Sequence, residues 1–267
     1  MSRKFTPPRA FLLDLDGTLY VGPRLMEATP RFLAALRERS IPHIFLTNNS
    51  SQSAREYYEK LVNRGIDLTI DQVLTSGDSA IRYLKKALGN PRVYLVGTPS
   101  LEDDFLRAGF TLDEDDPQCV VLGFDTGITY RKLEIAARHL YRGVPYFATQ
   151  PDITCITERG LTPDVGVFIA GLKIMTGREP EILGKPSIVM IDAAMERMGL
   201  ASLEGVAMVG DQLDTDITMG VVNGLISILL LSGETSLEKA QQFHLKPTHI
   251  FDHIGILLEK MLQTSTA

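Results

Sequence analysis

Two carboxylates stand one residue apart directly after an apolar stretch near the amino terminus. Residues 10–13 read Ala-Phe-Leu-Leu, and Asp14, Leu15 and Asp16 follow. Acids add little to the stability of a buried segment, because an ionised carboxylate loses its hydration there. A pair of this kind is suited to holding a cation or to reacting with phosphorus, so it marks a candidate site.

A third acid completes the donor set of a magnesium site. Asp211 follows the apolar stretch 206–210, and no His or Cys lies near any of these acids in sequence. Carboxylate oxygens are hard ligands, so Asp14, Asp16 and Asp211 predict Mg²⁺ as their occupant. An Asp held beside Mg²⁺ can attack phosphorus, and a second Asp can protonate the leaving oxygen and later deprotonate water.

Donors for a phosphate come from two other places in the chain. The stretch 47–51 offers Thr47, Asn48 and Asn49 at an expected strand-to-helix turn, where helix starts favour anions. Lys185 stands just before an expected helix and could neutralise the phosphate. Each motif alone has a structural explanation, as a turn, a helix cap or a surface lysine. Together they have the order and spacing that one reaction needs.

Short apolar stretches alternate with amphipathic ones along the chain. The pattern predicts helices over 29–40, 53–65 and 187–200, and strands over 10–15, 43–48, 93–97, 119–124, 145–149, 206–210 and 226–231. Strands that are apolar on both faces indicate a parallel sheet covered by helices. We therefore expect an α/β fold, with a Rossmann-like doubly wound parallel sheet and a site beyond the carboxyl ends of its strands.

The middle of the chain has its own strand-helix pattern, but its strands are not followed by acids that would converge on one site. Turn-forming residues bracket it on both sides. We expect a catalytic core formed by 1–77 and 183–267, with 78–182 inserted as a second α/β domain.

Composition limits the classes of partner. The 267 residues carry a formal net charge of -6, which disfavours nucleic-acid binding through a general basic surface. The apolar stretch 224–233 is too short to span a membrane, and no signal peptide is evident. Two cysteines, Cys119 and Cys155, lack metal-type spacing, which favours a reduced, cytoplasmic protein. The acidic run 113–116 predicts a solvated turn.

Four motifs resemble those of the haloacid dehalogenase superfamily of phosphohydrolases. They read "DLDGTLY" from Asp14, "LTNNS" from Leu46, "GKPS" from Gly184 and "GDQLDTDITMG" from Gly210. The long insertion between the second and third motifs is similar to the C2a cap of the NagD-like and p-nitrophenyl-phosphatase enzymes. The cap strings "ATQPD", "TERGL" and "TGREPEILGKPS" are also of that type.

The resemblance implies a role for each residue. Asp14 would be the nucleophile and Asp16 the general acid and base, while Thr47 and Asn48 would hold the phosphoryl group and Lys185 would steady it. Mg²⁺ would bind Asp14, Asp211 and the backbone oxygen of Asp16, and Asp216 would support metal-bound waters or Lys185. The sequence departs from the family at two positions, with Gln150 where Asn is common and Gln212 where Arg or Asn is common.

The inserted domain is expected to select a small phosphorylated metabolite. The stretch 150–166 has no aromatic residue to stack on a base. It offers polar groups that suit hydroxyls, namely Gln150, Asp152, Thr154, Glu158 and Arg159. Sugar or polyol phosphates are therefore favoured over nucleotides or pyridoxal phosphate.

Three alternatives stay open at this point. Attack of Asp14 on phosphorus would give an aspartyl-phosphate intermediate. The same intermediate could serve a mutase or a phosphotransferase, in which water must be excluded from the site. A non-catalytic ligand-binding protein is a further possibility, although both Asp14 and Asp16 are present. The stretch 165–175 is apolar on most sides, which would also suit a homodimer interface in the cap.

Overall fold

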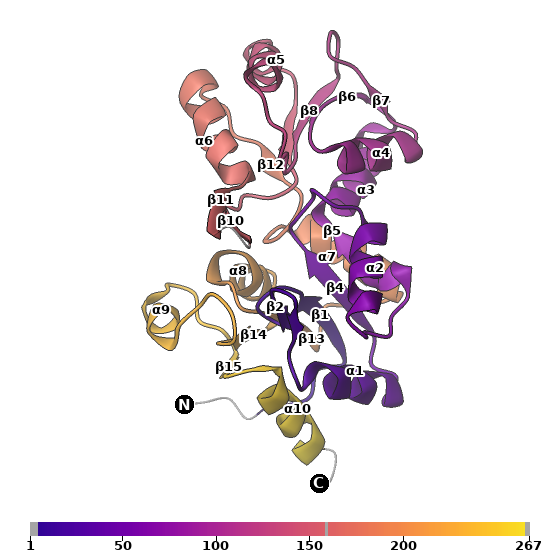
Figure 1. The fold of residues 1–267 in the computed structure, drawn as a ribbon, viewed down its shortest axis with the longest axis vertical. Helices are drawn as coiled ribbons and strands as arrows, with labels where there is room; N and C mark the ends of the chain where they lie inside the picture. The colour runs from indigo at the N-terminus through magenta and orange to yellow at the C-terminus, as the bar shows by residue number, and fades with distance from the viewer. Residues whose placement is uncertain (1–4, 158–159, 265–267) are drawn as a thin grey trace. The chain divides into compact units, whose positions relative to one another are not determined.

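The computed structural model describes residues 5–157 and 160–264 and contains two compact units (Figure 1). One unit comprises Met1–Leu46, Tyr58–Val73 and Ala194–Ala267, and the other comprises Thr47–Tyr57 and Leu74–Ala193. The expected insert, 78–182, falls inside the second unit, and its boundaries as a domain stay a prediction. Each unit is an α/β structure, which confirms the predicted fold class.

A six-stranded sheet, which belongs mainly to the first unit, has the strand order β15-β14-β13-β1-β4-β5. Its strands are β1 (Ala10–Asp14), β4 (His43–Thr47), β5 (Val73–Thr75), β13 (Val206–Gly210), β14 (Ile226–Leu230) and β15 (His249–Phe251). The first two pair in parallel, as do β13, β14 and β15 with their neighbours. All five residues of β1, β4 and β13 are buried, as expected for strands covered on both faces.

The strand order reverses at β1, which lies between β13 and β4. In this register Leu13 stands opposite Val209, and Asp14 stands opposite Leu46. Because parallel strands end at the same edge, the residues that follow β1, β4 and β13 start from neighbouring positions. Such a reversal point is where open α/β sheets bind ligands.

The other elements along these parts of the chain are helices and a short hairpin. They are α1 (Thr29–Glu38), α2 (Ala54–Asn63), the 3₁₀ turn η1 (Ile70–Gln72), α7 (Ile188–Met198), the π-helical turn η2 (Leu213–Ile217), α8 (Thr218–Val222), α9 (Leu237–Gln242), α10 (Ile254–Gln263), and the hairpin β2 (Tyr20–Val21) and β3 (Arg24–Leu25). Helix α1 buries Phe32, Leu33 and Leu36, the three residues that the periodicity places on one side.

The second unit has its own parallel sheet, in the order β12-β9-β8-β6-β7. Its elements are α3 (Ser76–Leu88), β6 (Arg92–Val96), α4 (Pro99–Arg107), β7 (Thr111–Leu112), β8 (Cys119–Leu122), α5 (Tyr130–Tyr141), β9 (Tyr146–Ala148), the hairpin β10 (Thr154–Thr157) and β11 (Gly160–Pro163), α6 (Val165–Thr176) and β12 (Glu181–Ile182).

Alternation along β8 builds two core layers in this unit. Val120 and Leu122 pack with residues of α5 and α6, whereas Cys119 and Val121 pack with residues of α3 and α4. Successive side chains of a strand point to opposite faces, so one strand supplies both layers. Cys119 is fully buried in one of these layers.

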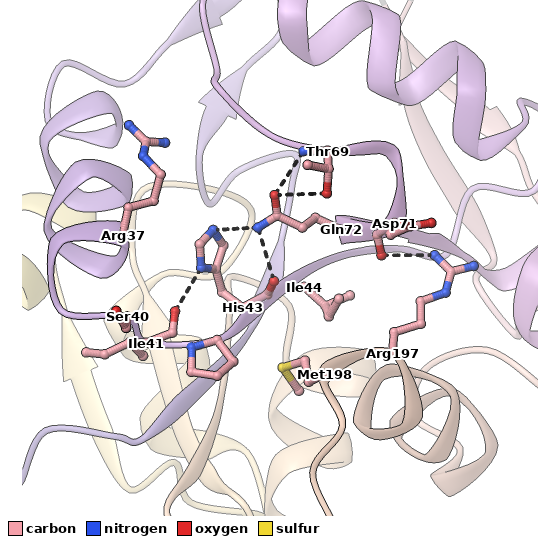
Figure 2. Close-up of a pocket in the computed structure, with 11 residues that line it drawn as sticks. Arg37, Ser40, Ile41, His43, Ile44, Thr69, Asp71, Gln72, Arg197 and Met198 are labelled. Carbon is pink, nitrogen blue, oxygen red and sulfur yellow. Dashed lines mark hydrogen bonds between the residues drawn. The ribbon is translucent and has the colours of Figure 1, made fainter.

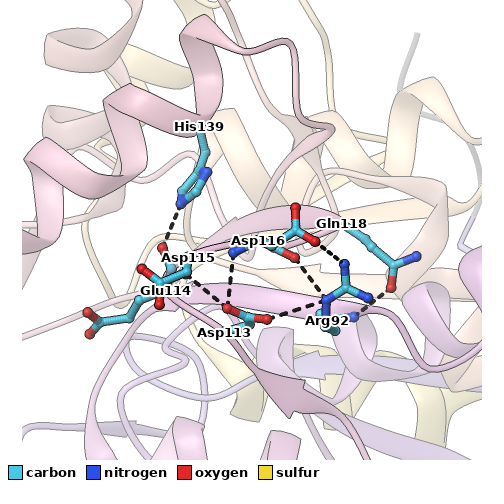
Figure 3. A network of polar contacts seen from close by, with 7 residues as sticks. All are labelled: Arg92, Asp113, Glu114, Asp115, Asp116, Gln118 and His139. Atoms are coloured by element: carbon cyan, nitrogen blue, oxygen red, sulfur yellow. Dashed lines mark hydrogen bonds and ion pairs between the residues drawn. The ribbon is translucent and has the colours of Figure 1, made fainter.

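The acidic run 113–116 is an ordered turn after β7 (Figure 3). The Asp113 carboxylate accepts hydrogen bonds from the backbone N–H groups of Asp115 and Asp116, at 2.9 and 3.1 Å. Arg92 pairs with the carboxylates of Asp113 and Asp116, at 3.3 and 2.7 Å. These contacts fully account for the acidic cluster as a structural feature.

Among the helices that the structure describes, none combines the length and the apolar character needed to cross a membrane. Each of the seven predicted strand stretches contains a strand. The sequence did not predict the short strands β5, β7, β12 and β15 or the hairpins β2–β3 and β10–β11.

A pocket of about 320 Å³ opens at the amino end of β4, in the first unit (Figure 2). His43 lies in it and is 6% exposed. Its Nδ1 stands 3.1 Å from the carbonyl oxygen of Ile41, so Nδ1 carries the proton and donates. Nε2 accepts from the side-chain amide of Gln72 at 3.0 Å, and Gln72 in turn accepts from the backbone N–H of Thr69.

These contacts select the neutral imidazole. Burial is the main cause that lowers the pKa of His43 below its ordinary value, and the nearby Arg37 lowers it further, against the opposing bond to Ile41. Protonation would also turn Nε2 into a donor that faces the amide N–H of Gln72. The unfolded chain therefore takes up this proton more readily than the folded chain.

We expect His43 to make the protein less stable in acid. The free energy of unfolding should fall as the pH drops below about 6.5, the ordinary pKa of His, because the unfolded state binds the extra proton first. The variant His43→Asn keeps an amide donor and does not titrate, so its curve should be flatter between pH 7 and 5. Urea unfolding at several pH values measures this. Parallel curves for the two proteins would contradict the prediction.

Candidate active site

Three carboxylates meet in the first unit. One oxygen from each of Asp14, Asp211 and Asp216 lies within 4.8 Å of the other two, and all three residues are buried. Two unit charges at this distance repel by roughly 3.5 kcal/mol at an effective dielectric constant of about 20. Three acids that must share such a space are suited to a cation.

The sheet and the loops after it place each of these acids. Asp14 is the last residue of β1, and Asp211 is the first residue after β13. The Asp211 carboxylate accepts a hydrogen bond of 2.7 Å from the backbone N–H of Glu234. Asp216 lies in η2 and accepts from the backbone N–H of Gln212 at 3.1 Å. Backbone donors thus orient two of the three acids.

Glycines make room for the acids. A Cβ atom added at Gly17 or Gly233 would collide with the carboxylate of Asp211, and one added at Gly210 would collide with Asp216. Gly17 also has a φ of +80°, which other residues rarely adopt. The glycine in the "DLDGTLY" motif is therefore required both by the turn and by Asp211.

This donor set fits Mg²⁺, which binds carboxylates and keeps several waters. The sequence predicted the ligands Asp14, Asp16 and Asp211, with Asp216 in a supporting role. Among the described residues, Asp216 supplies the third carboxylate of the cluster. The predicted contribution of Asp16 is its backbone oxygen, and that assignment stays a prediction.

Asp16 has a different environment. It is exposed, and its carboxylate accepts a hydrogen bond of 2.9 Å from the hydroxyl of Tyr20. Tyr20 is fully buried, and the guanidinium of Arg64 lies 3.9 Å from the centre of its ring. A rigid phenol therefore orients a carboxylate that solvent can reach, which is the arrangement that proton exchange with a substrate requires.

The predicted phosphate loop belongs to the second unit. The Thr47 hydroxyl accepts from the backbone N–H of Asn49, and the Asn49 side chain accepts from the N–H and hydroxyl of Ser51. Helix α2 follows, with Ser53 and Glu56 capping its start reciprocally. Side-chain bonds thus shape the turn and leave a helix start next to it.

Asn48 and Lys185 are joined through the backbone. The amide oxygen of Asn48 accepts from the N–H of Lys185 at 2.8 Å, and its amide nitrogen donates to the carbonyl of Lys185 at 3.1 Å. A Cβ at Gly184 would collide with the carbonyl of Thr149 and crowd Asn48. Lys185 itself is 3% exposed. The structure brings together two residues that stand 137 positions apart in the chain.

Two of the predicted cap residues lie next to this pair. The carboxylate of Asp152 accepts from the amide nitrogen of Asn48 at 2.7 Å. Gln150 has no exposed surface and hydrogen-bonds to protein groups. Thr154 is exposed on β10, while Glu158 and Arg159 lie outside the described residues.

Sequence reasoning missed several residues of both sites. Tyr20 stands inside the quoted "DLDGTLY" motif, four residues after Asp16, so its spacing in a tight turn was a usable signal. Glu234 and Gly233 contact Asp211 from a loop without any pattern. Ser76 donates to the carbonyl of Asn48 at 2.5 Å, and nothing in the sequence pairs these two.

The chain is similar to known hydrolases. Residues 11–111 match the haloacid dehalogenase-like hydrolases, and residues 182–257 match the HAD-hydrolase-like family. The acid sugar phosphatase of Staphylococcus epidermidis is 33% identical over 254 residues, which are 95% of this chain and 98% of that protein.

Solved structures show the same likeness. The 4-nitrophenylphosphatase of Thermotoga maritima has a TM-score of 0.91 and 40% identity, covering 94% of this chain and 97% of that one. A glycerol phosphate phosphatase of Mycobacterium tuberculosis, in complex with magnesium, has a TM-score of 0.85 and 32% identity, covering 95% of this chain and 76% of that one.

The chain therefore belongs to the haloacid dehalogenase-like hydrolases. The resemblance to the NagD-like and p-nitrophenyl-phosphatase enzymes is confirmed, and so is the predicted class of enzyme, a phosphatase of small phosphate substrates.

Proposed function

We propose that this enzyme is a Mg²⁺-dependent phosphatase of sugar or polyol phosphates that works through an aspartyl-phosphate on Asp14. The observation that carries the proposal is the cluster of Asp14 with two further buried carboxylates at the reversal point of the sheet. A nucleophilic Asp must be placed beside the cation that accompanies the phosphate. This cluster would supply both the nucleophile, Asp14, and carboxylate ligands for the cation.

The reaction runs in two halves. In the first half, a carboxylate oxygen of Asp14 bonds to phosphorus while the ester P–O bond breaks, and Asp16 gives its proton to the departing oxygen. In the second half, a water oxygen attacks phosphorus while Asp16 takes a proton from that water. The bond between Asp14 and phosphorus then breaks, which restores the carboxylate and releases inorganic phosphate.

The phosphate needs positive charge and N–H donors during both halves. Asp14 stands opposite Leu46 in the sheet, and Thr47 is the next residue. We assign the Thr47 hydroxyl and the backbone N–H groups of Asn48 and Asn49 to the phosphoryl oxygens. The Asn48 side chain is already bonded to Lys185 and Asp152, so its role is to hold Lys185, whose charge would steady the phosphate.

Mg²⁺ would be held by Asp14, Asp211 and the backbone oxygen of Asp16, with Asp216 supporting its waters. When bound, it would offset the negative charge of these acids and of the phosphoryl group. The magnesium complex of the M. tuberculosis relative supports this choice of metal.

The proposed substrate class rests on two observations. The relatives include an acid sugar phosphatase and a glycerol phosphate phosphatase, both of which act on hydroxyl-rich molecules. The stretch 150–166 lacks an aromatic residue that could stack on a base. Nucleotides and pyridoxal phosphate are the alternative substrates, and a phosphotransferase would give transfer to an alcohol in place of phosphate release.

Helix α6 supports a homodimer through the second unit. Val167, Ala170, Gly171 and Ile174 form an exposed apolar stripe at helical spacing, and Ile174 is 89% exposed. Small residues at the middle of the stripe allow a second copy of the helix to approach closely. The presence of two cysteines without metal-type spacing fits a reducing cytoplasm, and the net charge of -6 fits the absence of a nucleic-acid partner.

The nucleophile can be tested by Asp14→Asn. We expect kcat to fall by at least about 10⁴-fold, because an amide cannot form the covalent intermediate. Phosphate release from p-nitrophenyl phosphate measures this, with circular dichroism to show that the protein is folded. A folded variant that retains a tenth of the activity would refute the assignment.

The substrate class can be tested on a panel of sugar phosphates, glycerol phosphates, nucleotides and pyridoxal phosphate. We expect kcat/KM for a sugar or polyol phosphate to exceed that for every nucleotide by roughly tenfold or more, a difference of about 1.4 kcal/mol. A preference of the same size for nucleotides would reverse the substrate assignment while leaving the phosphatase mechanism intact.

The dimer can be tested by Ile174→Glu, which places a charge in the stripe. We expect sedimentation to show a dimer for the wild type and a monomer for this variant. Tyr130→Glu is the matched control, because Tyr130 is 83% exposed on α5, outside the stripe. A wild-type protein that sediments as a monomer would refute the proposed dimer interface on α6.

A further inference from the structure

Gln150 is the centre of a buried polar network in the second unit. It lies just after β9, and neither Gln150 nor its neighbour Thr149 has any exposed surface. A buried amide must have its donors and acceptor satisfied, since a buried polar group without a partner has lost its hydration and gained nothing in return. Its partners therefore show what the residue holds in place.

Three hydroxyls face the amide oxygen of Gln150. The Thr149 hydroxyl lies at 2.7 Å, and those of Ser50 and Ser76 lie at 3.1 Å. Each hydroxyl has one proton to donate, and Ser76 also stands 2.5 Å from the carbonyl of Asn48. A consistent arrangement has Ser50 donating to Thr149 and Thr149 donating to Gln150, while the Ser76 proton is shared between the carbonyl of Asn48 and the amide oxygen of Gln150.

The amide nitrogen of Gln150 faces the start of α6. It donates to the carboxylate of Asp164 at 3.0 Å, and the same oxygen accepts from the N–H of Val165 at 2.6 Å. Asp164 is the N-cap of α6. Burial raises the pKa of Asp164 to about 7, and the charge of Asp152 adds to this, while the bonds from Val165 and Gln150 favour the ionised form.

The segment between these groups is also fixed. The N–H of Gly166 donates to the carbonyl of Asp152 at 2.7 Å, and a Cβ at Gly166 would collide with the carbonyl of Pro151. Asp152 then reaches Asn48, whose amide brackets Lys185. A closed ring thus runs from Gln150 through Ser76, Asn48 and Asp152 to the start of α6, and returns through Asp164.

We propose that Gln150 is a positioning residue that fixes Asn48, and with it Lys185, relative to the start of α6. The inference rests on the proposed function, in which Asn48 and Lys185 serve the phosphate. Gln150 acts through its partners, because its own side chain is enclosed and its amide is engaged at both ends.

The chemistry predicts which kinetic parameter changes. A loosened Asn48 would let the backbone of residue 185 shift, so the phosphate of substrate and product would bind less tightly. The acids of the first unit, which carry the bond-making steps, are not part of the ring. Loss of Gln150 should therefore raise KM and the inhibition constant of inorganic phosphate more than it lowers kcat.

The test compares Gln150→Met and Ser76→Ala with a control. Met has a similar length without the amide, and Ser76→Ala removes the hydroxyl that joins Gln150 to Asn48. We expect either variant to raise the inhibition constant of inorganic phosphate by roughly tenfold, with kcat reduced by less than threefold. Tyr94→Phe is the matched control, because it removes one hydrogen bond of 2.9 Å to Lys132 in the same unit, away from the ring.

The outcomes separate the two proposals. If Lys185→Met leaves phosphate inhibition unchanged, the assigned phosphate site is wrong. If Lys185→Met weakens inhibition while folded Gln150→Met and Ser76→Ala match the wild type, the site stands and the positioning role is wrong. If Tyr94→Phe changes the inhibition constant as much as the other two, the effect follows from stability alone and the inference is overturned. Should Gln150→Met fail to fold, Ser76→Ala carries the test.

Discussion

Mutual repulsion among three buried acids is the constraint on which the first unit depends. Asp14, Asp211 and Asp216 lie within 4.8 Å of one another, and the backbone makes room for them at Gly17, Gly210 and Gly233. Backbone N–H groups orient two of them. A fold selected for stability alone would gain by replacing such acids, so the arrangement is best explained by the cation and the phosphate that it can hold.

In the second unit, the main constraint is the position of Lys185. Lys185 is 3% exposed, and its backbone is held at both polar atoms by one amide, that of Asn48. Ser76 and Asp152, which lie in or near the inserted segment, hydrogen-bond to Asn48, and Gln150 faces the hydroxyl of Ser76. In our proposal, the segment that selects the substrate therefore also supports the residues that bind its phosphate. This would couple substrate choice to phosphate affinity without any direct contact from Gln150.

The sequence predicted the parts of this structure that depend on local pattern. Apolar stretches located β1, β4 and β13, and the polar residues that follow them located both candidate sites. The order of the strands in the sheet could not be predicted from the local pattern. That β1 and β13 are neighbours is known only from their hydrogen-bonded pairing in the structure. The enclosed amide of Gln150 was also beyond it, since a polar residue in a loop-like stretch gives no sign of burial. The contact of Tyr20 with Asp16, by contrast, had a signal in the sequence, which is the four-residue spacing inside one motif.

The central claim is that the acid cluster is a Mg²⁺ site. The most direct measurement is thermal unfolding of the wild type and of Asp211→Asn, each with EDTA and with millimolar Mg²⁺. The account predicts that Mg²⁺ raises the Tm of the wild type, because a ligand of the folded state stabilises it. It also predicts that Asp211→Asn, with one charge removed, has a higher Tm than the wild type in EDTA and no response to Mg²⁺. A wild-type Tm that is the same with EDTA and with Mg²⁺ would contradict the account.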